Sequence, residues 1–106
     1  MKRVIEGRSY DTNTASYVCD VPCNTDSPND FSWHDTSLYV SPKGTYFLAG
    51  EGGARSMWAE AVEGGRAHTG GRGLRLIDAD EARSIAEHAG LSEGRMRAAG
   101  FVVEEG

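Results

Sequence analysis

Alternating hydrophobic and polar positions fill the first part of the chain and predict β-strands. The segment Lys2–Tyr10 is expected to form a hairpin that turns at Glu6–Gly7. Thr14–Val21 is rich in β-branched and aromatic residues, which favours a third strand. One face of that strand would carry Ala15, Tyr17, Cys19 and Val21. We expect Pro22–Asp30, which is dense in turn-forming residues, to be a loop.

The clearest local signal is a β-hairpin formed by Ser37–Val40 and Thr45–Ala49. The connection is Ser41-Pro-Lys-Gly44, in which proline fixes φ at the second turn position and glycine suits the fourth. Aromatic residues in and around the hairpin are expected to form the core of a small sheet, with phenol groups at its rim. This aromatic set is Phe31, Trp33, Tyr39, Tyr46 and Phe47.

The hydrophobic period changes after Gly50-Glu-Gly-Gly53, which we interpret as a tight loop leaving a strand. Arg55–Val62 is compatible with one or two helical turns or with another strand. Glycines at 64–65 and 70–73 bracket a flexible span, and Leu74–Ile77 follows as a short strand.

Helical spacing appears in the last third of the chain. Asp78 is placed as an N-cap before a helix over Ala79–Ala89, which Gly90 ends. The apolar stripe that would pack on the sheet consists of Ala82, Ile85 and Ala86. A second helix is expected over Ser92–Ala99, and Phe101–Val103 is expected to add an edge strand.

Together these elements predict an α+β fold, in which a small, mainly antiparallel sheet is covered by a C-terminal helical pair. A chain of 106 residues is the size of one domain, so we expect residues 1–106 to form a single one. No apolar run approaches the length of a membrane span, and the start of the chain lacks the apolar stretch of a signal peptide. We therefore expect a cytoplasmic protein.

Charge is distributed unevenly, within a net charge of -5. This balance argues against binding to nucleic-acid phosphates. Residues 9–42 contain no Lys or Arg but carry five aspartates, which either form turns or make a docking surface for a basic protein partner. The candidate contact residues are Asp20, Asp26, Asp30, Asp35 and Glu51, with Tyr39 and Tyr46 on the hairpin.

Residues with reactive side chains do not form a recognisable catalytic or metal site. Cys19 and Cys23 are separated by three residues, and two cysteines cannot complete a four-ligand zinc site even if His34 and His68 are considered. We expect both cysteines to be small buried hydrophobic residues, and we expect no metal and no cofactor. The sequence around Glu51 lacks the glycine spacing and the Lys-Ser/Thr pair of a phosphate-binding loop.

Two stretches resemble a family of small proteins carried by phages and other mobile elements. One is Gly-x-x-Tyr-Asp-Thr-x-Thr-Ala over 7–15, and the other runs from Leu38-Tyr39 through Gly-x-Tyr-Phe-Leu-x-Gly-Glu-Gly-Gly over 44–53. A late acidic helix completes the likeness, and such small acidic proteins resemble anti-CRISPR proteins. The turn at Cys19–Cys23 and the arginines between 66 and 75 depart from the commonest pattern, which implies a different target surface.

The resemblance implies a non-enzymatic inhibitor, monomeric by preference, that binds a basic subunit of a type I CRISPR surveillance complex. It would block target DNA binding or nuclease recruitment. Three alternatives remain open from the sequence. They are another mobile-element protein that binds a host factor, a structural or accessory domain, and a small enzyme. An enzyme would need a cleft with convergent polar groups.

Overall fold

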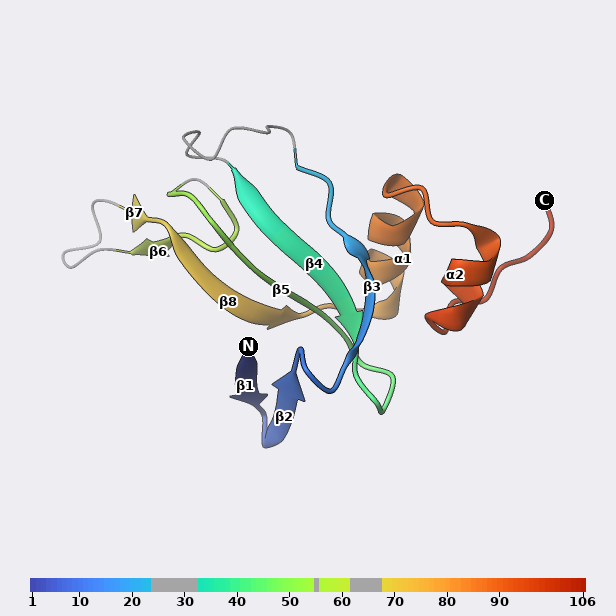
Figure 1. Cartoon of the computed structure of the whole chain (residues 1–106), viewed down its shortest axis with the longest axis horizontal. Coiled ribbons are helices and arrows are strands. Elements are labelled where there is room, and N and C mark those ends of the chain that lie inside the picture. Colours follow the sequence, from blue (N-terminus) through green and yellow to red (C-terminus); the bar gives the residue numbers. More distant parts are fainter. Residues whose placement is uncertain (24–32, 55, 62–67) are drawn as a thin grey trace.

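The computed structural model describes residues 1–23, 33–54, 56–61 and 68–106. Its centre is a four-stranded antiparallel sheet in the order β3-β4-β5-β8 (Figure 1). The strands are β3 (Ser16–Asp20), β4 (His34–Val40), β5 (Tyr46–Gly52) and β8 (Gly71–Leu76). The N-terminal hairpin lies against one face and the two C-terminal helices lie on the other side, which confirms the predicted α+β fold. Asp26, Asp30 and Phe31 lie outside the described residues.

The N-terminal hairpin consists of β1 (Lys2–Ile5) and β2 (Arg8–Asp11), as predicted. Glu6 and Gly7 occupy its turn with φ values of 51° and 79°. Two successive positive φ angles define a type I′ turn, whose twist matches that of the flanking strands. Beneath the hairpin, Tyr10 packs into a core cluster with three residues of the central sheet, namely Phe47, Ala49 and Leu74.

The hairpin of β4 and β5 is confirmed, but both strands are longer than predicted. Gly44, at φ 89°, ends the connection and donates its N–H to the Ser41 carbonyl at 2.9 Å. The expected tight loop at Gly50-Glu-Gly-Gly53 is wrong, because β5 continues through Gly52. A Cβ atom on Gly50 would overlap the Asp35 carbonyl oxygen, so glycine is needed where β4 and β5 approach closely.

The flexible span predicted before Leu74 is also partly wrong, since β8 already begins at Gly71. Gly73 faces the Trp58 ring, which would contact an added Cβ at 3.4 Å. Trp58 itself is buried and donates its Nε1–H to the Thr36 hydroxyl at 2.7 Å. The face of the indole therefore lies directly over β8 at Gly73.

A β-bulge in β3 overturns the predicted single face of that strand. The ladder to β4 pairs Tyr17 with Tyr39 and Cys19 with Leu38, so the register shifts between Tyr17 and Cys19. Val18 and Cys19 are consequently buried on the helix side, whereas Tyr17 is exposed. The extra residue of the bulge turns the strand over, which alternation alone cannot anticipate.

Of the two alternatives for Arg55–Val62, the described part contains a turn followed by a short strand. β6 (Glu60–Ala61) pairs antiparallel with β7 (His68–Thr69), which leads into β8.

The helical pair is α1 (Ala79–His88) and α2 (Glu93–Ala98), close to the predicted bounds. Asp78 caps α1 by accepting the Glu81 N–H at 2.7 Å, and Ser92 caps α2 in the same way. Ala82 and Ala86 are fully buried against the sheet, and Ile85 packs beside them. The small side chains allow α1 to lie close to the sheet.

Phe101–Val103 is not the edge strand that the sequence predicts. The Phe101 ring stacks on the Tyr46 ring at a centroid distance of 4.9 Å, and the Val103 carbonyl accepts from Arg97 at 3.2 Å. The segment therefore follows α2 and contributes a buried aromatic ring instead of pairing with the sheet as a strand.

Candidate protein-binding face

Strand alternation sorts the candidate contact residues between the two faces of the sheet. Asp35, Tyr39 and Glu51 point to the side of the N-terminal hairpin, which packs on this face over Phe47 and Leu74. Asp20 pairs with Ser37 and joins the same side. We call this surface the acidic face and define it by Asp20, Asp35, Glu51, Tyr17 and Tyr39.

The two carboxylates of Asp35 and Glu51 lie directly opposite each other across the β4–β5 ladder. Both residues are exposed, and in the described part of the chain neither forms an ion pair. On the other side of Glu51, Arg72 of β8 lies directly opposite it in the β5–β8 ladder. Like charges at directly opposed positions destabilise a sheet, and Arg72 opposite Glu51 offsets part of that cost.

Asp20 is held in place by two hydroxyl groups. Its Oδ1 accepts from the Tyr17 hydroxyl at 2.8 Å and from the Ser37 hydroxyl at 3.1 Å. Desolvation, followed by the hydrogen bond to Asp20, raises the pKa of Tyr17 to about 12. The Tyr17 phenol therefore stays neutral and orients an exposed carboxylate.

Aromatic rings run from the acidic face into the core beneath the hairpin. The Tyr17 and Tyr39 rings meet edge to face with centroids 6.0 Å apart, and Tyr39 stacks on Phe47 at 5.4 Å. Tyr17 is 53% exposed, so its ring is available to a partner. Sequence reasoning missed Tyr17 as a contact residue, because its position depends on the bulge.

Tyr46, a predicted contact residue, lies instead in the core on the helix side. It is buried, and its hydroxyl donates to the Ala99 carbonyl at 2.7 Å. Burial raises the pKa of the Tyr46 phenol. Tyr46 pairs with Val40, one position along from the pair of Tyr39 and Phe47, so period-2 alternation sends it to the opposite face.

His34 and Cys23 lie side by side, because the His34 backbone N–H donates to the Cys23 Sγ at 3.5 Å. Cys19 is buried, which raises the pKa of its thiol, and Cys23 is half-buried; neither forms a disulfide. The His34 Nδ1 lies 3.0 Å from the Thr36 hydroxyl, so the ring joins the hydrogen-bond network beneath Trp58. Within the described ranges, no group of three or more His, Cys, Asp or Glu side chains could hold a metal ion. The His68 side chain lies outside what the structure describes.

A shallow hollow of about 270 Å³ lies over the acidic face, lined in part by Asp35, Tyr39, Glu51 and Arg72. Its floor is sheet, and its charged groups stand at the ends of exposed side chains. This geometry suits contact with a protruding part of another protein.

Comparisons with protein-family models, curated proteins and solved structures return no match. In the part of the chain that the structure describes, no helix is long and apolar enough to cross a membrane.

Proposed function

We propose that this protein is a non-enzymatic inhibitor whose acidic face covers a basic surface on a protein partner. The observation that supports the proposal is the gathering of three carboxylates and two tyrosines on one open face of the sheet. Carboxylates give long-range attraction to a basic surface, and tyrosines supply rigid contact area.

The opposed carboxylates of Asp35 and Glu51 support a binding role over a structural one. Arg72 already lies opposite Glu51 in β8, so a basic surface would add attraction chiefly at Asp35 and Asp20. Lys or Arg side chains that bind nucleic-acid phosphates would meet carboxylates in place of phosphates. The proposed mode of action is therefore occlusion of a nucleic-acid site.

The resemblance to anti-CRISPR proteins makes a type I CRISPR surveillance complex the first partner to test. In this proposal a monomer binds a basic subunit in the cytosol of a bacterial host. It blocks either target DNA binding or nuclease recruitment, without a cofactor or a catalytic step.

The test measures binding of the protein to purified type I surveillance complexes of several subtypes, together with target DNA binding by each complex. The wild type should bind at least one complex and lower its DNA binding or its nuclease recruitment. The double variant Asp35→Asn/Glu51→Gln should bind at least about 10-fold more weakly, since central charges at an interface are worth a few kcal/mol. Its affinity should also depend less on salt.

The matched control is Glu104→Gln/Glu105→Gln, which removes the same charge from exposed residues at the end of the chain. This control should bind like the wild type. If Asp35→Asn/Glu51→Gln is folded and keeps the affinity and salt dependence of the wild type, the acidic face is not the contact. If the wild type binds no surveillance complex but captures another basic host factor through the acidic face, the partner assignment is wrong and the binding mode stands.

A further inference from the structure

We propose that the free edge of β8 is a second docking surface, which pairs with an extended acidic segment of a partner protein as an added β-strand. Arg3, Arg72 and Arg75 line this edge, and Arg72 also lines the hollow over the acidic face. The inference does not depend on the proposed function.

Among the residues that the structure describes, no strand pairs with the outer edge of β8, and the backbone register identifies which of its groups point outward. β8 is the last strand of the sheet, and the Ile77 N–H donates to the Tyr46 carbonyl at 3.2 Å. Antiparallel ladders alternate between bonded and non-bonded pairs, so Arg75, Gly73 and Gly71 bond to β5. The N–H and C=O groups of the alternate residues, Arg72, Leu74 and Leu76, therefore point away from the sheet.

A side chain from the hairpin supports this assignment. Arg3 donates its Nη1–H to the Leu74 carbonyl at 3.0 Å, as expected for a carbonyl on the outer edge. Pairing with an added strand therefore requires Arg3 to leave the Leu74 carbonyl, after which its guanidinium is free to contact a side chain of that strand.

The opposite edge of the sheet is closed to such pairing. β3 contains the bulge between Tyr17 and Cys19, and Arg95 of α2 donates to the Val18 carbonyl at 2.8 Å. Bulges and helices that lie over an edge are common ways of blocking an edge strand. The pairing of β8 with β5 shows no register shift over its six residues, so its edge remains regular.

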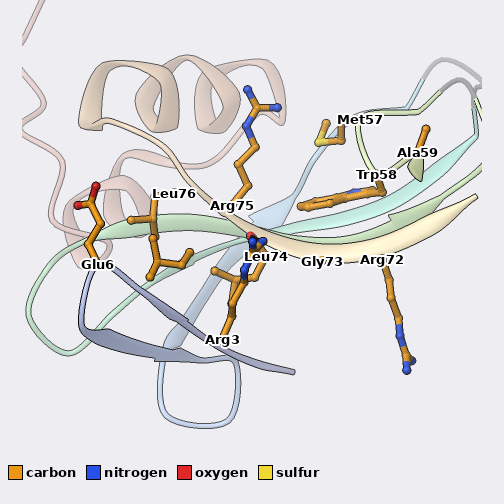
Figure 2. A pocket seen from close by; sticks show the side chains of 11 residues that line it. Arg3, Glu6, Met57, Trp58, Ala59, Arg72, Gly73, Leu74, Arg75 and Leu76 are labelled. Atoms are coloured by element: carbon orange, nitrogen blue, oxygen red, sulfur yellow. Dashed lines mark hydrogen bonds between the residues drawn. The ribbon is translucent and has the colours of Figure 1, made fainter. Parts of the chain in front are cut away.

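A groove runs along the free edge, as Figure 2 shows. It has a volume of about 540 Å³, with Arg3 and Glu6 of the hairpin on one side and Met57–Ala59 on the other. Trp58 lies over β8 at Gly73, and Met57 is 42% exposed. An extended strand laid along β8 would have walls on both sides.

The charge of the groove selects an acidic strand. Arg72 and Arg75 are exposed and point to opposite faces of β8, and Arg3 reaches the edge from the hairpin; Glu6 is the acid that lines the groove. An added strand would need acidic residues three positions apart, because one must face Arg72 and the other Arg75. If a second copy of this chain paired through its own β8, the arginines of both copies would lie along one interface. Repulsion between these like charges opposes such a dimer.

The probe for this inference is the capped peptide acetyl-Thr-Val-Glu-Val-Thr-Glu-Thr-amide. In antiparallel register, its valines lie opposite Leu76 and Leu74 and its glutamates opposite Arg75 and Arg72. Titration into ¹⁵N-labelled protein should shift the amide signals of β8 and slow hydrogen exchange at Arg72, Leu74 and Leu76. A peptide with lysine in place of glutamate should bind at least 10-fold more weakly.

Methylation of single peptide amides separates strand addition from loose charge attraction. N-methylation of the valines removes amides that face β8 and should abolish binding. N-methylation of the first glutamate and the middle threonine alters amides that face away, and should reduce affinity less than threefold. Equal loss with both methylation patterns, or signal changes confined to side chains away from β8, would overturn the proposal.

Protein variants give an independent readout with a matched control. Arg72→Gln and Arg75→Gln should each weaken peptide binding about fivefold, whereas Arg97→Gln on α2 removes the same charge outside the groove and should have no effect. Self-association of the free protein through β8, detected by sedimentation, would also refute the choice of partner. The single variant Asp35→Asn, whose strand β4 is separated from β8 by β5, should keep peptide binding, so failure here is distinguishable from failure of the proposed function.

Discussion

Replacing Gly50 by alanine should destabilise the protein strongly, although the residue lies in a glycine-rich stretch that resembles a loop. An added Cβ would overlap the Asp35 carbonyl oxygen and lie 2.7 Å from the Thr36 Cα. These contacts are with backbone atoms of β4, so no side-chain rotation can relieve them. The two strands would have to separate at the position where Thr36 binds Trp58.

Overpacking of this kind costs about 1 to 3 kcal/mol and sometimes more, because it forces backbone shifts. Alanine also restricts the unfolded chain, which offsets the cost by about 0.4 to 1 kcal/mol. Because the overlap is with backbone atoms, we expect Gly50→Ala to lie near the upper end of the net range, at a loss of about 2 kcal/mol of unfolding free energy. For a domain of this size, that corresponds to a fall in Tm of about 8 to 16 °C.

Gly73→Ala is the matched control, since Gly73 is the neighbour of Gly50 in the β5–β8 ladder. Its Cβ would contact only the Trp58 ring, at an ordinary 3.4 Å. This variant should stay within about 1 kcal/mol of the wild type. Urea unfolding followed by tryptophan fluorescence measures both variants, and equal stability of Gly50→Ala and Gly73→Ala would refute the close approach of β4 and β5.

Two further predictions concern buried and partly exposed tyrosines. Tyr46→Phe should lose about 1 to 3 kcal/mol in urea unfolding, because it leaves the buried Ala99 carbonyl without its donor; an unchanged midpoint would contradict the bond. Ultraviolet titration should find a tyrosine pKa of about 12 that is absent from Tyr17→Phe and lower in Asp20→Asn. Because the pKa of this phenol is higher in the folded chain than in the unfolded chain, the free energy of unfolding should fall as pH rises from about 10 toward 12. Titration of Tyr17 near its ordinary pKa would argue against the Asp20 contact.

The sequence by itself determined the elements whose signals are local. The turn at Glu6–Gly7, the connection before Thr45 and the cap at Asp78 each depend on a few neighbouring residues, and each appears where predicted. The stripe of Ala82 and Ala86 also identified the buried side of α1. Turn geometry and helix capping depend on three or four neighbouring residues, so both can be predicted from the sequence alone.

Tertiary structure decided which residues share a face. The bulge in β3 separates Tyr17 from Cys19, and the pairing of β5 with β4 and β8 makes strands of glycine stretches that otherwise indicate loops. Asp35 meets Glu51 only through the pairing of β4 with β5. Register and packing join residues distant in the chain, and no local pattern encodes them. The acidic face and the free edge of β8 are therefore properties of the folded sheet, built on charges that the sequence already displays.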